Sequence, residues 1–424
     1  MNAALISLLA LLAAIVISMV SQRNVGLIAL ALAWLIGVYI AGLSADVVMG
    51  GFPVSLLLTV TGVTLLFGCA EENGTLQVLA AQVARLARGR SQVLPILFFL
   101  VAATVSMVGP GSISSVAVVI PLAGAIGERA RVPWFLIALM VTNGANSGNL
   151  SPLSSVGVVA NSRMAAAGIG GHEWLVFAAN FAAHVIVSVV AYLLFGRFTN
   201  NNVDWNDDVR PEAEPNQIGY RHWLTMVVIA LWITGVIIFR LNLGLSAFAG
   251  SALILILRAS HEREAIRLVP WNVVIMVTGV ATLIALMEKT GGLDLFTTLL
   301  ARLANPGTVN GVMALIAGTI STYSSTSGVV LPAFLPTVPG LIDRIGGGNP
   351  LAVALSINIG SALVDVSPLS TLGAMCVAAV RNPEESRQLF NRLMLWGLAM
   401  IPTGAVLCHF FAEWFVGIGL VAAN

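Results

Sequence analysis

Four short clusters of small polar residues mark the places where this chain of 424 residues could do chemistry. Two of them, at 109–115 and 324–328, are rich in Gly and hydroxyl residues. The other two, at 143–152 and 358–368, combine Asn, Gly and Ser and end in Ser-Pro. All four lie within long apolar runs, where backbone that leaves a helix must be satisfied by protein or must line a cavity. These residue types suit the binding of ions rather than covalent chemistry.

The clusters at 109–115 (Gly-Pro-Gly-Ser-Ile-Ser-Ser) and 324–328 (Ser-Ser-Thr-Ser-Gly) predict that one helix stops and another begins. Pro and Gly end a helix, and hydroxyls cap the next one. A helix start presents unpaired N–H groups and a positive dipole end, which together make an anion site without Arg or Lys. Simple turn chemistry is the alternative. The expected substrate-binding residues are Ser114, Ser115, Asn149, Ser151, Ser325, Thr326 and Ser367.

The clusters at 143–152 and 358–368 predict helices that unwind midway and free carbonyl oxygens. Carbonyl, hydroxyl and amide oxygens suit Na⁺. The expected cation-binding residues are Ser112, Asn146, Ser147, Ser154, Ser327, Ser361, Asp365, Ser370 and Thr371. Asp365 is the one acid well inside a predicted span, and such residues are costly unless they function. It could hold a cation, carry a proton, or cap a broken helix.

The remaining chemical groups predict neither an enzyme nor a covalent cofactor. His184 and His409 lie in apolar runs without a motif partner, so packing explains them. Cys69, Cys376 and Cys408 have no metal or redox spacing. We therefore expect Na⁺ or H⁺ as the coupling ion and no other cofactor.

The composition excludes a water-soluble protein. Apolar residues make up 58% of the chain and charged residues 9%, whereas soluble domains have about 25% charged residues. The net charge of +1 and the lack of a basic run exclude nucleic acid as a partner. The chain therefore belongs in a lipid bilayer.

The apolar runs predict an all-α polytopic membrane protein. Ten of them read as crossings, at 3–20, 25–43, 52–70, 133–165, 174–195, 222–239, 243–257, 270–287, 350–380 and 390–416. Two more, at 92–127 and 309–345, are interrupted near the middle, and each arm of about 15 residues is short of the roughly 20 that span a bilayer. These two runs predict re-entrant hairpins, while 133–165 and 350–380 predict broken helices.

Basic residues are distributed unevenly between the two sides of this topology. Fifteen of the 20 Lys and Arg fall on one side, which the positive-inside rule makes cytoplasmic. Both termini are then outside, and the polar segment 197–221 is a cytoplasmic linker. We expect a multi-pass protein of a bacterial inner membrane.

The chain also repeats itself. Val-Thr-Gly-Val occurs at 60–63 and again at 277–280, and the hairpins share similar segments at 118–121 and 329–332. The broken helices likewise share Ser-Pro-Leu-Ser, at 151–154 and 367–370. The first repeat is 1–196 and the second is 222–424. Since each holds five crossings, the two are inverted, and inverted repeats with interrupted helices are typical of secondary transporters.

These residues resemble the ion-transporter superfamily that includes divalent-anion/sodium symporters. Its hairpin tips carry Ser-Asn-Thr signatures a fixed distance before a Pro, and 111–121 and 322–332 keep that spacing, with Ser112 and Tyr323 in place of the Asn. Residues 1–150 look most like the malonate/dicarboxylate carrier family called MatC. The resemblance implies two sodium sites, each made by one tip and one break. It also implies a homodimer held by a scaffold of the first three spans of each half, against which hairpins and broken helices move as an elevator.

The sequence favours import of a small dicarboxylate, such as malonate, by symport with Na⁺ or H⁺. A cation/proton antiporter with Asp365 as the titrating group is the main alternative. A membrane-embedded hydrolase or acyltransferase would need a converging nucleophile, base and acid, which the sequence does not indicate. A passive channel is disfavoured, because unwound helices in inverted halves indicate alternating access.

Overall fold

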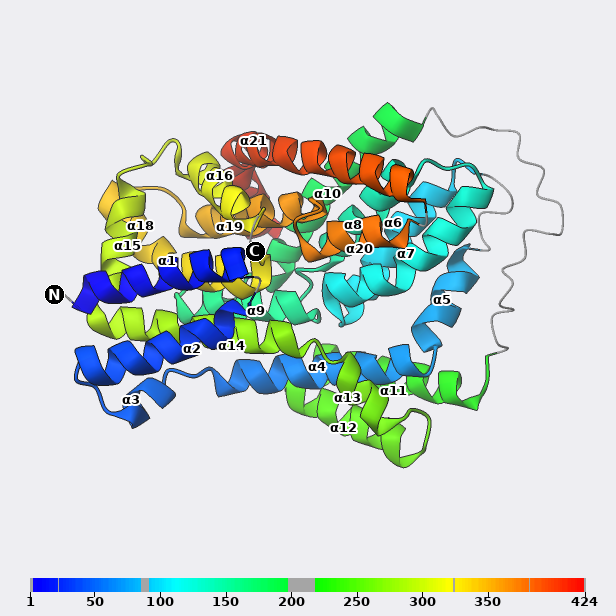
Figure 1. The fold of residues 1–424 in the computed structure, drawn as a ribbon, viewed down its shortest axis with the longest axis horizontal. Coiled ribbons are helices and arrows are strands. Elements are labelled where there is room, and N and C mark those ends of the chain that lie inside the picture. Colours follow the sequence, from blue (N-terminus) through cyan, green and yellow to red (C-terminus); the bar gives the residue numbers. More distant parts are fainter. Residues whose placement is uncertain are drawn as a thin grey trace.

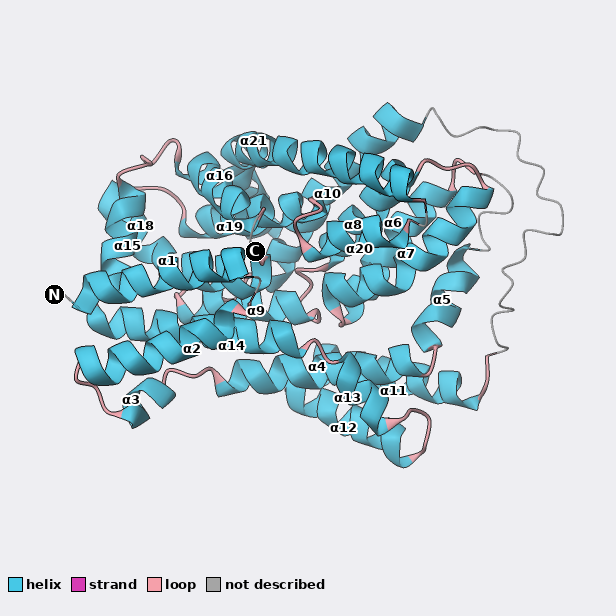
Figure 2. Ribbon diagram, in the orientation of Figure 1, coloured by secondary structure: helices cyan, strands magenta, loops and turns pink. Residues whose placement is uncertain are grey.

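The computed structural model describes residues 3–21, 23–84, 91–196, 218–322, 325–380 and 382–422, and in this part every regular element is a helix (Figure 2). The first half contains α1 (Ala3–Ser21), α2 (Val25–Leu35), α3 (Ala45–Met49), α4 (Val54–Glu72), α5 (Thr75–Ala84), α6 (Leu94–Val108), α7 (Gly111–Arg129), α8 (Trp134–Gly148), α9 (Ser155–Ala166) and α10 (Glu173–Phe195). A π-helical turn, Ile36–Ile40, extends α2.

The second half contains α11 (Tyr220–Phe239), α12 (Leu243–Ile256), α13 (Glu262–Leu268), α14 (Trp271–Thr290), α15 (Gly292–Ala301), α16 (Val309–Ser321), α17 (Leu331–Phe334), α18 (Val338–Ile345), α19 (Pro350–Leu363), α20 (Thr371–Ala379) and α21 (Pro383–Ala422). Shorter turns are η5 (Thr326–Val330), η6 (Leu335–Thr337) and η7 (Val364–Val366). Most of the predicted linker, at 197–217, lies outside the described residues.

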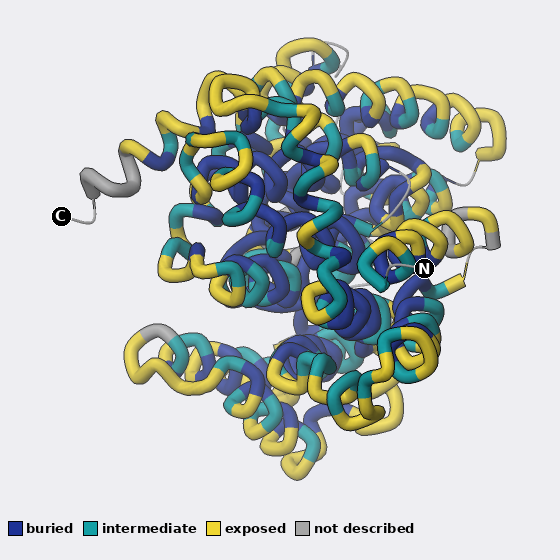
Figure 3. The backbone as a smooth tube through the Cα atoms, turned by 90° about the vertical axis from the view of Figure 1, so that its left-hand side faces the viewer, coloured by how far each residue is buried: buried dark blue, intermediate teal, exposed yellow. Residues whose placement is uncertain are grey.

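Seven helices of the described part are long and apolar enough to cross a membrane. The outer face of α21 shows why these helices need lipid, because its large apolar side chains include Leu395 at 70% exposure and Phe410 at 68%. Figure 3 shows buried residues along the inside of the helix assembly and exposed ones along its outside. The prediction of an all-helical polytopic membrane protein is confirmed, whereas ten crossings, two re-entrant hairpins and inversion of the halves stay predictions.

The two halves cross each other reciprocally. In Figure 1, α2 lies along α14, and α4 lies along α12. A Cβ on Gly26 or Gly279 would meet backbone of the facing helix at 2.2 Å, and one on Gly62 or Gly244 would meet it at 2.4 Å. Gly26 and Gly244 hold matching positions in the repeats, as do Gly62 and Gly279. Each crossing therefore brings two glycines together, as small residues do where membrane helices approach closely.

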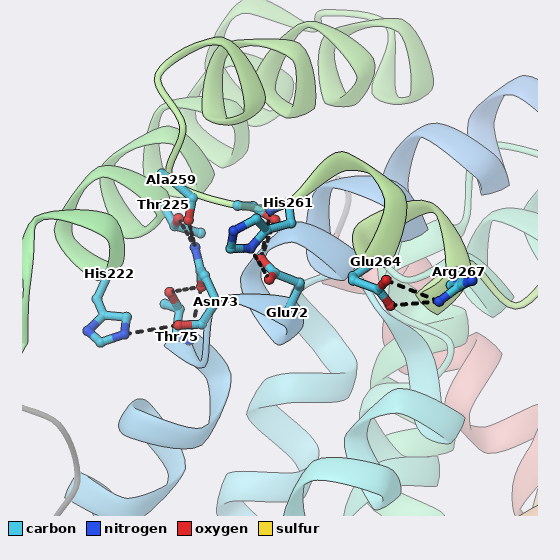
Figure 4. A network of polar contacts seen from close by, with 10 residues as sticks. Glu72, Asn73, Thr75, His222, Thr225, Ala259, His261, Glu264 and Arg267 are labelled. Atoms are coloured by element: carbon cyan, nitrogen blue, oxygen red, sulfur yellow. Dashed lines mark hydrogen bonds and ion pairs between the residues drawn. The ribbon is translucent and has the colours of Figure 1, made fainter.

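A polar junction joins the halves where α4 passes into α5 (Figure 4). Asn73 Nδ2 donates to Thr225 Oγ1 at 2.7 Å and to the Ala259 carbonyl at 3.0 Å. The neighbouring Glu72 carboxylate accepts from the backbone N–H of His261 at 2.9 Å and lies 2.6 Å from the Nδ1 atom of its ring. Asn73 and Glu72 thereby anchor the end of α4 to α11 and to the turn before α13.

Each interrupted run forms two helical arms, and the second arms are longer than the sequence suggested. α6 has 15 residues, but α7 has 19. Gly111–Glu128 and Thr326–Ile345 count among the seven candidate spans, the latter because η5, α17, η6 and α18 follow one another without a gap. The expected arm of about 15 residues therefore fits the first arm of the first hairpin and not its second.

Both predicted broken helices are interrupted in the structure. α8 ends at Gly148 and α9 starts at Ser155, while α19 ends at Leu363 and passes through η7 before α20. Two matching glycines hold the restarted helices close to the turns before them. A Cβ on Gly157 would lie 1.9 Å from the Ser151 carbonyl oxygen, and one on Gly373 would lie 2.2 Å from that of Ser367.

The glycine crossings lead to a test of how tightly the halves pack. Gly279→Ala should lower the free energy of unfolding by about 1–3 kcal/mol, since the new methyl overlaps backbone that cannot rotate away. Thermal unfolding of the detergent-purified protein measures this effect. Gly417→Ala is the matched control, because a Cβ there meets nothing within 4 Å. Equal melting temperatures for the two variants would contradict the close crossing.

Candidate functional site

A cavity of about 430 Å³ lies where all four polar clusters meet. Nine of the predicted site residues line it: Ser112, Ser114, Asn149, Ser325, Thr326, Ser327, Asp365, Ser370 and Thr371. The connection between α1 and α2 and the first turns of α14 close another side of the cavity. The cavity is therefore bounded by both hairpin tips, both helix breaks and the outer helices of the fold.

The first hairpin tip turns sharply and is bonded to its own break. Gly111 has φ +80°, a left-handed conformation that favours glycine, and a Cβ there would lie 2.7 Å from Ser155 Oγ. The Ser112 N–H donates to Asn149 Oδ1 at 3.1 Å, and the Ser155 N–H donates to the Gly109 carbonyl at 3.0 Å. The side chain of the break thus satisfies an N–H at the start of α7, where the helix itself offers no acceptor.

The second hairpin tip is bonded to its own break through an acid. Thr326 Oγ1 lies 2.9 Å from Asp365 Oδ2 and 2.5 Å from Ser321 Oγ. Ser325 caps η5 by accepting from the Gly328 N–H at 3.1 Å. Asp365 therefore occupies the place that Asn149 holds in the first half, with a carboxylate where the first half has an amide.

The Asp365 turn is held by further hydroxyls. Ser370 donates to the Asp365 backbone carbonyl and accepts from the Gly373 N–H, so it caps α20. Among the described residues that line the cavity, Asp365 is the one acid and Arg23 is the one base. Both charges face a space that also receives the starts of α7 and η5, whose positive dipole ends favour an anion.

Arg23 is the residue that sequence reasoning missed. It lies in the connection from α1 to α2, beside Asn24, whose Nδ2 donates to the Asn272 carbonyl at 2.7 Å. In the sequence, Arg23 stands alone between two apolar runs and looks like an ordinary topology signal. One feature of the sequence could have pointed to this connection. The segment 24–27, which begins with the neighbouring Asn24, is repeated in the second half at 242–245. The expected anion site without Arg or Lys thus has a guanidinium in its lining.

Three predicted substrate residues do not line the cavity. Ser115 Oγ donates to the Ala102 carbonyl at 2.7 Å and so joins the arms of the first hairpin. Ser151 and Ser367 are buried, and each accepts at 3.3 Å from the N–H two residues further along its own turn. The hydroxyls of these three residues hold the local backbone.

Four predicted cation residues also lie behind the lining. Asn146 Nδ2 donates to the Ala362 carbonyl at 3.2 Å, across the interface between α8 and α19. Ser147 and Ser361 bond carbonyls of their own helices, at 2.7 Å each. Ser154 is buried, and its Oγ has no partner among the described residues.

The lining leads to an accessibility test at two adjacent serines. Ser114→Cys should react with a hydrophilic maleimide, because Ser114 faces the cavity. Ser115→Cys should react far more slowly, because Ser115 is fully buried between the arms. The native Cys69, Cys376 and Cys408 are all buried, so background labelling should be low. Equal labelling of the two variants would contradict the orientation of this tip.

Comparisons with known proteins agree on the class of protein. Residues 1–149 match the family model described as the dicarboxylate carrier protein MatC N-terminus. The fold is similar to that in the crystal structure of the Alcanivorax borkumensis YdaH transporter, with a TM-score of 0.59 and 19% identity over 92% of this chain and 96% of that one. A search of curated proteins found no match. The prediction of a transporter rather than an enzyme is confirmed, and the predicted resemblance to the MatC dicarboxylate carriers is confirmed over residues 1–149.

Proposed function

We propose that the protein imports a small dicarboxylate, malonate or a similar diacid of three or four carbons, by symport with Na⁺. One observation carries the proposal. Both hairpin tips, both breaks, Arg23 and Asp365 line the same cavity. The dicarboxylate carrier family of residues 1–149 supports this class of substrate.

The tips and Arg23 supply the anion part of the proposed site. Ser114 and Ser325 line the cavity at the starts of two helical segments. Helix starts bind anions through N–H groups and dipoles, and a guanidinium binds carboxylates with two parallel hydrogen bonds. Two such starts and one Arg match a ligand that has a carboxylate at each end.

The negative charge of Asp365 explains why anion binding would be coupled to cation binding. A dianion and a carboxylate in one cavity of about 430 Å³ repel each other strongly, since the medium there screens less than water. A cation bound by Asp365, Thr326 and nearby carbonyls would remove that repulsion. Binding of the anion then requires binding of the cation, and this dependence is what symport needs.

We propose that the hairpins and broken helices move as one unit past a scaffold. The scaffold consists of the first three spans of each half and also forms a homodimer. The glycine crossings of α2 with α14 and of α4 with α12 support this division, because they tie scaffold helices of one half to those of the other. The orientation in a bacterial inner membrane, with termini outside and residues 197–221 in the cytoplasm, belongs to the same proposal.

A cation/proton antiporter is the second candidate. Asp365 favours it, since an acid that faces the cavity could exchange a proton for a metal cation. The two helix starts and Arg23 favour the symporter, because an antiporter has no use for anion-binding groups.

Uptake of labelled malonate into proteoliposomes, with Na⁺ and pH gradients imposed separately, tests the proposal. We expect uptake driven by an inward Na⁺ gradient. Uptake of neither malonate nor succinate under either gradient would overturn the proposal. Cation-dependent proton release without anion uptake would indicate the antiporter.

Substitution of Asp365 should change the ion dependence of transport. Asp365→Asn keeps the shape and the contact with Thr326 but removes the charge, so cation affinity should fall at least about tenfold. Na⁺ titrations of malonate uptake measure this change. Asp343→Asn, which removes an exposed acid on α18, is the matched control. Unaltered Na⁺ dependence of Asp365→Asn would exclude Asp365 as the coupling residue.

Substitution of Arg23 should weaken anion binding. Arg23→Gln should raise the half-saturation concentration for malonate about tenfold, the effect of losing one charge-assisted contact. Concentration series of uptake at saturating Na⁺ measure it. Arg302→Gln, at an exposed position after α15, controls for the change in net charge. Equal half-saturation values for the two variants would exclude a role for Arg23 in anion binding.

A further inference from the structure

A second group of buried polar residues lies behind the cavity, where α8 packs against α10 and α19. It centres on Asn146, Asn180 and His184, which are all fully buried. Asn180 Nδ2 donates to the Asn146 carbonyl at 2.8 Å, and His184 Nδ1 lies 2.9 Å from the Asn180 carbonyl. Asn146 Nδ2 in turn reaches the Ala362 carbonyl on α19. These three residues are therefore linked by hydrogen bonds from side chains to backbone carbonyls, and we call them the Asn–His cluster.

The orientations of the Asn146 and Asn180 side-chain amides follow from the groups that they face. A carbonyl oxygen only accepts hydrogen bonds, so the atom that faces it in Asn146 and in Asn180 must be the NH₂ group. Each Oδ1 then points elsewhere as an acceptor. Neither Oδ1 has a partner among the described residues.

The same reasoning favours one tautomer of His184. Its Nδ1 faces the Asn180 carbonyl, so Nδ1 carries the hydrogen. In a neutral ring Nε2 is then an acceptor, and Nε2 also has no partner in the described part of the chain. The Ala362 carbonyl lies close to the ring but is another acceptor. The cluster thus holds three orphaned acceptors and lacks a donor.

Two further unpaired acceptors lie about one helical turn earlier, one on α8 and one on α19. Asn143 on α8 and Asn358 on α19 donate through Nδ2 to carbonyls of their own helices, at 2.9 Å each. Both are fully buried or nearly so, and the Oδ1 of each also lacks a partner among the described residues. An unmade hydrogen bond in a protein interior is costly, so a group of this kind calls for a bound donor.

We propose that His184 is a proton-binding site. A hydrated proton forms an N–H bond at Nε2 and leaves its water behind, which turns the acceptor into a donor. The new N–H can donate to the Ala362 carbonyl beside the ring, so one proton removes one of the orphaned acceptors and supplies a donor. Desolvation opposes the imidazolium charge, and the backbone carbonyls of Asn180 and Ala362 stabilise it.

The charged groups near His184 are few. α8 and α19 carry no titratable side chain, and α10 carries Glu173 and Tyr192 toward its ends. The titratable groups of α9, η7 and the described part of α21 are Arg163, Asp365, Glu384, Glu385, Arg387, Arg392, Cys408, His409 and Glu413. Of these, Asp365 follows Ala362 most closely along the chain. The elements packed against His184 therefore place few charged groups near the ring, and Asp365 is the acid that lies closest in sequence to Ala362.

The position of the Asn–His cluster links the proton to the cavity. The Asn149 N–H donates to the Asn146 carbonyl at 3.2 Å, and Asn149 lines the cavity. On α19, the chain passes from Ala362 through one short turn to Asp365. A proton on His184 therefore lies next to both helix breaks and would move with them. This inference goes beyond the proposed dicarboxylate symport and holds whichever anion is carried.

Nitrogen NMR of the histidine rings tests proton binding without any transport. The detergent-purified full chain, labelled with ¹⁵N-histidine, is titrated from neutral to acidic pH. The chain has five histidines. We expect one Nε2 signal to change from the acceptor to the N–H type, to be missing in His184→Gln and to remain in His409→Gln. His409 is a matched control because its ring is exposed beside Phe410.

Two outcomes would overturn the proposal. The first is a His184 Nε2 signal that stays of the acceptor type over the whole titration. The second is a signal that responds to Na⁺ at fixed pH and not to protons, which would make the cluster a metal-cation site. Neither outcome depends on malonate uptake, so a failed symport proposal and a failed proton site are distinguishable.

Proteoliposome uptake gives a second readout. In His184→Gln, an imposed pH gradient should no longer change the rate of uptake, while Na⁺ dependence remains. His184→Asn should behave in the same way. It serves as the second variant if the longer Gln side chain disturbs folding, and its NH₂ group keeps a donor near the Asn180 carbonyl. A pH response in both variants equal to that of the unsubstituted protein would overturn a role for this proton in transport.

Discussion

The structure depends on one constraint: backbone that leaves a helix at membrane depth must find hydrogen-bond partners within the protein. Each break meets this need through the hairpin tip of its own half. Asn149 accepts from the Ser112 N–H in the first turn of α7, and Asp365 contacts Thr326 at the start of η5. Tip and break are thus one structural unit in each half. The cavity exists because two such units face each other.

The outer helices solve a different problem, that of holding two similar halves together without large polar surfaces. Helices in lipid gain little from apolar burial against one another, so close backbone approach matters more. The glycine pairs of the two crossings allow that approach, and the polar junction at Asn73 and Glu72 adds directional bonds at one end. These contacts hold the outer helices of the two halves together. The tips and breaks are positioned separately, by the hydrogen bonds between them.

Much of this arrangement could be read from the sequence because Gly, Pro, Asn and Ser gather in four clusters, and together they interrupt helices. Their four clusters predicted the helix interruptions that surround the cavity. The rotation of single side chains could not be read in this way. Ser114 and Ser115 are adjacent in sequence, yet one lines the cavity and the other bonds the neighbouring arm.

Two other features escaped the sequence for physical reasons. Arg23 enters the lining because the chain folds back between α1 and α2, and a short connection carries no periodic signal. The Asn–His cluster is made by three helices, and no single helix shows that its acceptors outnumber its donors. In the sequence alone, His184 looks like a ring packed among apolar residues. Its unpaired acceptor is recognised only when Asn146, Asn180 and Ala362 are seen beside it.

The pairing of Asn149 with Asp365 limits how such a protein can originate. A dimer of two identical half-length chains must carry either two acids or none at this level of its cavity. A cavity with a single carboxylate requires two halves that differ from each other. Asp365, the one acid among the described lining residues, thus gives the cavity a direction that a symmetric dimer would lack.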